Sequence, residues 1–246
     1  KDYSTLLTSI NKYITDKTGK YGIHFISLTN NQEFGISEND GFVAASTVKV
    51  PINLYLYKKI ASKEVDPNEK ITYKECDYEE GTGSIQDEDY GSKYTIDELS
   101  RRSIEESDNV AINMLLRYLG SDEVNNFKES VLKHPVDRDR NILSPKDMSY
   151  FMKDILDFKE KHPKEGEKLL YYLKNTEFND RIPKYLPSNV AVAHKIGNQV
   201  NVMNDSGIIF ADKPFILSVF SKDVNEDEAC EVIGKIAKMI YDFEES

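Results

Sequence analysis

Residues 189–221, NVAVAHKIGNQVNVMNDSGIIFADKPFILSVFS, decide most of the fold. Three apolar segments in this stretch have the residue types and the length of β-strands. Asp212-Lys213 separates the last two segments by the length of a hairpin turn. The expected strands are 189–196, 206–211 and 214–221. The C-terminal part of the chain therefore predicts three strands that follow one another.

The N-terminal part of the chain adds two strands to this sheet. YGIHFISL at 21–28 is typical of one strand, and a turn then leads to a second strand around 32–36. Apolar residues at helical spacing precede these strands and follow the last strand, at Leu6, Leu7, Ile10, Tyr13 and Ile14 and at Ala229, Val232, Ile233, Ile236 and Ile240. We therefore predict a five-stranded antiparallel sheet flanked by an N-terminal and a C-terminal helix.

The middle of the chain, from about residue 46 to about residue 186, has a mostly helical pattern. The strands from both chain ends must then enclose an inserted all-helical domain. The expected fold class is α/β (α+β), with 1–45 and 188–246 in the sheet domain and 46–187 in the helical domain. A cleft between the sheet and the helices is the expected place of an active site.

The composition excludes several classes of function. The chain has 39% hydrophobic and 30% charged residues, as globular proteins do, and a formal net charge of −11. This acidic balance argues against nucleic acid as a partner, because phosphate backbones are bound by clustered cations. No apolar run approaches the ~20 residues that cross a bilayer, so we expect no integral membrane span.

Histidine and cysteine give no sign of a metal site. The four histidines are scattered without the spacing of metal ligands, and GxSxG, GxxxxGK[ST] and HExxH motifs are absent. We therefore expect neither a metal nor a cofactor. Cys76 and Cys230 lie far apart in the chain, which favours two free, buried thiols over a disulfide.

A serine followed three residues later by a lysine occurs three times. On a helix this spacing places both side chains on one face, where the amine can take the proton of the hydroxyl. Ser9–Lys12 and Ser130–Lys133 lie in amphipathic segments, where a solvated helix face explains them. Ser46 instead opens the apolar helix VPINLYL, whose burial would carry Lys49 into the interior and lower its pKa. Ser46 is therefore the candidate nucleophile.

Two further motifs follow in the chain. Ser107-Asp108-Asn109 precedes the apolar segment VAINMLLRYL and, taken alone, favours a helix cap. Lys195-Ile196-Gly197 lies at the end of a predicted strand, whereas a literal Lys-Thr-Gly at 17–19 precedes Ser46 and ends a helix. The chemistry requires a lysine on a strand that lines the cleft, so we assign the third motif to Lys195.

In this order, the motifs Ser46-x-x-Lys49, Ser107-Asp108-Asn109 and Lys195-x-Gly197 resemble the three signature motifs of class A β-lactamases and penicillin-binding proteins. The resemblance covers nearly the whole chain, from about residue 3 to residue 243. It implies a sheet domain with a helical insertion, in agreement with the strand pattern. Further similar segments are Gly81-Thr-Gly-Ser-Ile-Gln, Tyr94-Thr-Ile-Asp-Glu-Leu and Gly207-Ile-Ile-Phe through Phe220.

The resemblance implies a catalytic role for three side chains. Ser46 would be the acylated nucleophile, and Lys49 would be its general base or proton carrier. Ser107 would pass the proton to the leaving nitrogen. The protein would then be a serine hydrolase of the β-lactamase type, EC 3.5.2.6.

The resemblance also implies a substrate-binding role for residues of the second and third motifs. Asn109 would bind the side-chain amide of the substrate, and Lys195 would attract its carboxylate next to Gly197. The backbone N–H groups of Ser46 and Asn198 would form an oxyanion hole, worth ~3–4 kcal/mol per donor in comparable enzymes.

The chain departs from the class A pattern at two places. Class A β-lactamases carry a loop glutamate, within Glu-x-x-Leu-Asn, that activates the deacylating water. Here the segment from His134 to Ser144 lacks that pattern and is about ten residues shorter. Asp137 and Asp139 are its carboxylates, and their arginine neighbours favour a surface ion-pair cluster. Ile196 replaces the hydroxyl residue of the third motif, which removes a donor worth ~1–3 kcal/mol.

Three hypotheses about function therefore stand. The first is a β-lactam hydrolase, and the second is a D-alanyl-D-alanine carboxypeptidase, penicillin-binding protein or related amidase or esterase with slow deacylation. The third is a module that binds β-lactam or peptidoglycan without turnover. The expected partner is a small-molecule β-lactam or a peptidoglycan stem peptide, and we expect a monomer. The family implies an extracellular or cell-envelope location, and the first residue, Lys1, is compatible with a removed export or anchor segment.

Overall fold

The predicted five-stranded antiparallel sheet is present in the computed structural model, which describes residues 1–246. The strand order is β2-β1-β9-β8-β7, so the two N-terminal strands lie beside the three C-terminal strands in one sheet. β1 pairs with β9 along its whole length, which joins the N-terminal hairpin to the C-terminal strands. The strands are β1 (Lys20–Ser27), β2 (Glu33–Ile36), β7 (Ala191–Gln199), β8 (Val202–Phe210) and β9 (Phe215–Lys222).

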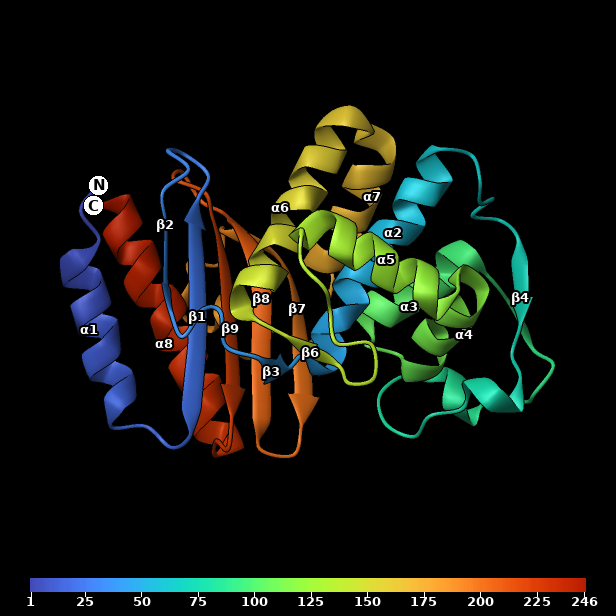
Figure 1. Ribbon diagram of the computed structural model, residues 1–246, viewed down its shortest axis with the longest axis horizontal. Coiled ribbons are helices and arrows are strands. Elements are labelled where there is room, and N and C mark those ends of the chain that lie inside the picture. Colours follow the sequence, from blue (N-terminus) through green and yellow to red (C-terminus); the bar gives the residue numbers. More distant parts are fainter. The chain divides into compact units, whose positions relative to one another are not determined.

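Two helices cover one face of this sheet, α1 (Ser4–Thr15) and α8 (Glu226–Glu245), as Figure 1 shows. Alternate residues of each strand point to this face, because side chains alternate across a strand. Phe25 of β1 and Leu217 of β9 lie directly opposite each other and are fully buried there. Both chain termini lie together beside these helices (Figure 1), as the predicted flanking helices require.

Short elements complete the sheet unit. The pair β3 (Phe42–Val43) and β6 (Ile142–Leu143) forms a small antiparallel ladder. The 3₁₀ turn η1 (Ala45–Val48) begins two residues after β3, and the 3₁₀ turn η4 (Ile182–Tyr185) precedes β7. The first turns of α6 (Pro145–Lys161) also belong to this unit.

The helical unit has its own buried core. Leu56, Leu99, Met114 and Leu115 are fully buried within it. A short ladder of β4 (Lys70–Thr72) with β5 (Lys93–Thr95) lies in this unit, so the expected all-helical domain contains a small sheet. The helices are α2 (Lys49–Ala61), α3 (Ile96–Glu105), α4 (Asn109–Leu119), α5 (Ser121–Leu132) and α7 (Pro163–Lys174), with the 3₁₀ turns η2 (Glu75–Asp77) and η3 (Ile85–Asp87).

The chain divides into two compact units whose limits differ from the expected ones. The sheet unit comprises 1–47, 137–153 and 178–246, and the helical unit comprises 48–136 and 154–177. Residues 46–47, 137–153 and 178–187, which were expected in the helical domain, therefore group with the sheet. Their side chains explain this grouping, since Ser149 bonds to Ser218 of β9 and Ile182 is buried in the core of the sheet unit.

The expectations for single residues were partly right. Cys76 and Cys230 form no disulfide, but Cys76 is exposed and Cys230 half-buried, so the expected burial of both thiols was wrong. No group of three or more histidine, cysteine, aspartate or glutamate side chains is arranged to hold a metal ion. None of the helices is both long enough and apolar enough to cross a membrane.

Candidate active site

Ser46 lies in the sheet unit, in a tight turn that follows β3. The expected helix does not begin at Ser46, because η1 covers Ala45–Val48 and α2 begins only at Lys49. Ala45 has a φ of +49°, a left-handed conformation that costs an L-residue on the order of 1 kcal/mol. The Ser46 side chain is half-buried. The turn thus presents a partly accessible serine from a strained backbone.

Hydrogen bonds to the carbonyl groups before Ser46 hold this turn in place. The Ala44 carbonyl accepts from the N–H of Thr47 at 3.2 Å and from its hydroxyl at 2.6 Å. The side-chain amide of Asn204 on β8 donates to the carbonyl of Val43 at 2.8 Å. The sheet therefore fixes the segment that leads into Ser46, which is the kind of support that keeps a strained residue in place.

The third motif lies inside β7, which extends to Gln199, and not at a strand end as expected. Gly197 packs against the turn so closely that an added Cβ would lie 2.6 Å from the Ala44 carbonyl oxygen. A side chain at this position would push the strand and the turn apart. Within the sheet unit, the structure thus brings Gly197 next to the residues on both sides of Ser46.

Lys195 and Asn198 flank Gly197 on the same strand. Lys195 is fully buried, and its ammonium group donates to the carbonyl of Ile196 at 3.2 Å. Asn198 is exposed and lies opposite Met203 in the β7–β8 ladder. Ile196 is buried, so an apolar side chain occupies the place of the hydroxyl residue of this motif.

Lys49, the first residue of α2, belongs to the helical unit and is 3% exposed. The expected burial of this lysine is therefore confirmed. Its ammonium group donates to the Ser107 carbonyl at 2.6 Å, to the Ser107 hydroxyl at 3.2 Å and to the Asn109 side-chain oxygen at 2.8 Å. The structure thus brings three of the predicted site residues into direct contact within one unit.

Burial lowers the pKa of Lys49 to about 8, because removing an ammonium group from water disfavours its charged form. The negative charges of Asp108 and Glu79 act in the opposite direction and favour the ammonium form. At neutral pH roughly a tenth of such lysines would be neutral, against a negligible fraction for an exposed lysine. Lys49 can therefore take up and release a proton near neutral pH.

The second motif is both a helix cap and part of this cluster. Asp108 caps α4, and its carboxylate accepts from the N–H groups of Ala111 at 2.8 Å and Ile85 at 3.0 Å. Ser107 has a φ of +55°, and its carbonyl accepts from the Thr82 hydroxyl at 2.6 Å. The cap thus fixes the left-handed turn that directs Ser107 and Asn109 toward Lys49.

The Gly81-Thr82-Gly83 segment fits against this turn. Gly81 and Gly83 both have positive φ values, and a Cβ on Gly81 would lie 2.7 Å from the Asn109 side-chain nitrogen. The Thr82 carbonyl accepts from the N–H of Asn109 at 3.1 Å. A Cβ on Gly83 would lie 2.4 Å from the Cα of Asp108, so glycine is required there, and the positive φ of Gly81 also favours glycine.

The other two serine–lysine pairs show the expected local bonding. The Ser9 hydroxyl donates to the carbonyl of Thr5 within α1, and the Ser130 hydroxyl donates to the carbonyl of Phe127 within α5. Ser9 and Ser130 are both exposed. These hydroxyls satisfy their own helices, as serine often does on a helix surface.

The short loop holds its carboxylates in a local cluster. Asp137 accepts from the N–H groups of Asp139 and Arg140, and its carboxylate pairs with the Arg140 guanidinium at 2.6 Å. Hydrogen bonds from the backbone and side chain of Arg140 hold the pKa of Asp137 below its usual range. These contacts fit the expected surface ion-pair cluster.

Sequence reasoning missed three residues that hold the site. Asn204 and Asn141 donate to carbonyl groups around Ser46, and Thr82 donates to the carbonyl of Ser107. Their partners are 25 to 161 positions away in the chain, so no local pattern marks them. A partial signal existed at Thr82, because a residue between two glycines often lies where two backbones meet.

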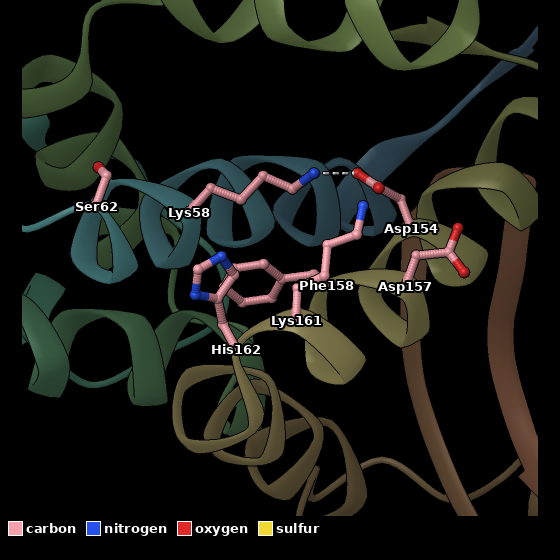
Figure 2. Close-up of a pocket in the computed structure, with 7 residues that line it drawn as sticks. All are labelled: Lys58, Ser62, Asp154, Asp157, Phe158, Lys161 and His162. Carbon is pink, nitrogen blue, oxygen red and sulfur yellow. Dashed lines mark hydrogen bonds and ion pairs between the residues drawn. The ribbon is translucent and has the colours of Figure 1, made fainter.

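A separate cavity of about 260 Å³ lies in the helical unit (Figure 2). The Lys58 ammonium group reaches the Asp154 carboxylate at 2.7 Å, and the His162 ring packs against Phe158. None of the predicted site residues lines it. The lining residues are Lys58, Ser62, Asp154, Asp157, Phe158, Lys161 and His162.

Comparisons with solved structures show a common fold. The protein described as PBP-A gives a TM-score of 0.92 at 24% identity, over 99% of this chain and 97% of that one. The extended-spectrum β-lactamase TLA-1 gives a TM-score of 0.90 at 23% identity, over 99% of both chains. These values show the β-lactamase and transpeptidase fold.

Comparisons of sequence extend this likeness along the whole chain. Beta-lactamase VEB-1 of Pseudomonas aeruginosa is 24% identical over 97% of this chain and 90% of its own length. Beta-lactamase BRO-1 of Moraxella catarrhalis is 25% identical over 83% of this chain and 74% of its own length. The family model described as "Beta-lactamase enzyme family" matches residues 5–243. The chain therefore belongs to the β-lactamase enzyme family, which groups serine β-lactamases with penicillin-binding proteins.

Proposed function

We propose that the protein is a serine acyl-enzyme hydrolase that opens β-lactam amides through Ser46. The observation that carries this proposal is the buried amine of Lys49, which contacts the Ser107 hydroxyl and the Asn109 side chain. A buried lysine with a pKa of about 8 is a competent base, whereas a solvated lysine is protonated at neutral pH.

The proposed acylation step uses these groups in order. The neutral amine of Lys49 takes the proton of the Ser46 hydroxyl while the serine oxygen attacks the lactam carbonyl. The C–N bond of the ring breaks, and the leaving nitrogen receives a proton from Ser107, which recovers one from Lys49. The product is an ester between Ser46 and the opened ring.

The binding groups proposed for this step come from the second and third motifs. Asn109 has a side-chain amide suited to a peptide-like substituent, and Lys195 is a buried cation suited to a carboxylate. The N–H groups of Ser46 and Asn198 would stabilise the oxyanion. The close packing of Gly197 against the turn supports this role, because it holds that part of β7 beside the serine.

The loop favours slow release of the acyl group. Asp137 is bound to Arg140 and to two backbone N–H groups, so it is not poised to activate a water molecule. Asp139 is exposed on the same loop. Acylation would then be efficient and deacylation slow.

This loop favours a second candidate, a D-alanyl-D-alanine carboxypeptidase or other penicillin-binding protein, for which a long-lived penicillin ester is typical. PBP-A shares the fold, and a mutant of PBP-A was solved as an acyl-enzyme complex with penicillin G. The third candidate, a module that binds peptidoglycan or β-lactam without turnover, would use the same site around Ser46. For all three, we propose an extracellular or cell-envelope location, a small-molecule β-lactam or a peptidoglycan stem peptide as partner, and a monomeric state.

A fluorescent penicillin distinguishes these functions, with Ser46→Ala as the control. Turnover of the penicillin, slow or fast, supports the β-lactam hydrolase, and a stable label on Ser46 supports the other two. Release of D-alanine from a stem peptide then separates the peptidase from the binding module. Equal behaviour of Ser46→Ala and the unmodified protein would refute acylation at Ser46.

A further inference from the structure

Ala45, the residue before Ser46, needs hydrogen bonds from its surroundings to keep its left-handed conformation. Ala45 has a φ of +49°, and relaxation to a right-handed or extended conformation would relieve on the order of 1 kcal/mol of backbone strain. Asn204 and Thr47 hold the two preceding carbonyl groups, those of Val43 and Ala44. Neither residue is the hydrogen-bond donor to the carbonyl of Ala45 itself.

That donor is Asn141, the residue that ends the short loop just before β6. Its side-chain amide donates to the carbonyl of Ala45 at 3.0 Å, and its own carbonyl accepts from the N–H of Ala44 at 2.8 Å. Asn141 therefore holds the turn by two bonds, 96 positions away in the chain. One bond comes from the backbone and survives any substitution, whereas the other depends on the side chain.

We propose that Asn141 is a positioning residue for the nucleophile. Through the Ala45 carbonyl it fixes the strained turn and hence the direction of the Ser46 hydroxyl, and it couples the conformation of the loop to acylation. The inference rests on the proposed function, because it assigns to Asn141 a role in the acylation of Ser46. The loop would then contribute to acylation by positioning Ser46, although it lacks the class A glutamate.

The chemistry of this contact explains why an amide is present. A carbonyl oxygen requires a donor, and the side-chain nitrogen of asparagine supplies one at any pH. An aspartate of the same shape would place a carboxylate oxygen against the carbonyl oxygen. Protonation of that carboxylate would restore a donor, so Asn141→Asp converts the contact into one that depends on pH.

The test compares Asn141→Ala and Asn141→Asp with the unmodified protein, using the rate constant for acylation by a fluorescent penicillin. Both variants should acylate about tenfold more slowly at neutral pH, since small misplacement of a nucleophile is costly. Asn39→Ala is the matched control, because Asn39 is an exposed asparagine of the same unit that bonds only to the neighbouring Glu38 side chain. Its rate should equal that of the unmodified protein.

The pH dependence separates positioning from a general loss of structure. Relative to the unmodified protein at the same pH, Asn141→Asp should recover at least about threefold between about pH 7.5 and about pH 4, whereas Asn141→Ala should not recover. The other charged groups of the loop, Asp137, Arg138, Asp139 and Arg140, are present in all these proteins and cancel in the ratio. Unchanged acylation by Asn141→Ala, or equal pH dependence of the two variants, would overturn the proposal.

A second measurement keeps this inference apart from the proposed function. If penicillin does not acylate the unmodified protein, the proposed function fails, and hydrogen exchange of the Thr47 N–H decides the inference. This group donates to the Ala44 carbonyl inside the turn. Its exchange should be at least about tenfold faster in Asn141→Ala than in Asn39→Ala, because the turn opens more often. Equal exchange in the two variants would refute the positioning role.

Discussion

Two strained turns carry the candidate nucleophile and its candidate proton relay, and they are held in different ways. Ala45 before Ser46 and Ser107 itself both have positive φ values, +49° and +55°. At Ser107, candidate site side chains contact one another, because Lys49 bonds to both Ser107 and Asn109. At Ser46, the neighbours Asn141, Asn204 and Gly197 contact backbone atoms. In the proposed mechanism, the helical unit would supply the proton-transfer groups, whereas the sheet unit would position the nucleophile.

The largest expected effect comes from removing the amine of the helical unit. Lys49→Met should lower the acylation rate by about 10²–10⁴-fold, because it removes the proposed base and keeps an unbranched apolar stem. Stopped-flow measurement with a fluorescent penicillin gives this rate. Lys128→Met is the matched control, since burial also lowers the pKa of Lys128 to about 8 but this lysine contacts Asn125 instead of the second motif. If Lys49→Met changed the acylation rate only slightly, the proposed proton-transfer role of the helical unit would be wrong.

The pH dependence of acylation should come from the helical unit. The pKa of Lys49 is lowered from 10.5 to about 8, and its neutral form is the proposed base, so the rate should rise with pH and level off above about 8. Between about pH 6 and about pH 9 the neutral fraction increases by about a hundredfold. A rate that falls with pH in this range would show that the ammonium form is the reactive one.

Two glycine substitutions test the difference between the turns directly. Gly197→Ala should slow acylation by at least about tenfold, because its Cβ would displace the Ala44 carbonyl beside Ser46. Gly83→Ala should lower the free energy of unfolding by more than about 1 kcal/mol, since Gly83 has a φ of +99° and its Cβ would overlap Asp108. Acylation rates and thermal unfolding of both variants check this, and the reverse pattern would contradict it.

The smallest effect is expected on the loop. Asp137→Asn should leave the deacylation rate within about twofold, because the Asp137 carboxylate is bound to Arg140 and to two backbone N–H groups and is not poised to activate water. The half-life of the acyl-enzyme, followed by loss of the fluorescent label, measures this. A decrease of tenfold or more would identify Asp137 as the residue that activates the water.

The sequence predicted the sheet well because its strands follow a simple pattern. The apolar segments at both chain ends pair as expected, and the apolar first turn of α2 correctly predicted that Lys49 is buried. The strand ends were less accurate, since β7 continues through Gly197 to Gln199. The residues of this extension do not continue the apolar pattern of the strand, so the sequence does not indicate that they pair with β8.

The supports of the site could not be predicted in the same way. Positive φ values at Ala45 and Ser107 leave no mark in a sequence, because neither residue is a glycine. The contact of Asn141 with Ala45 joins segments that only the folded chain brings together. Motif spacing predicts candidate reactive side chains, but tertiary contacts decide how they are held.

Mass spectrometry of the intact protein after reaction with penicillin G, followed by peptide mapping, locates the acylated residue. We expect one penicilloyl group per chain, attached to the Ser46 oxygen, and no adduct in Ser46→Ala. An adduct on another serine, or equal modification of Ser46→Ala, would contradict the assignment of Ser46 as the nucleophile.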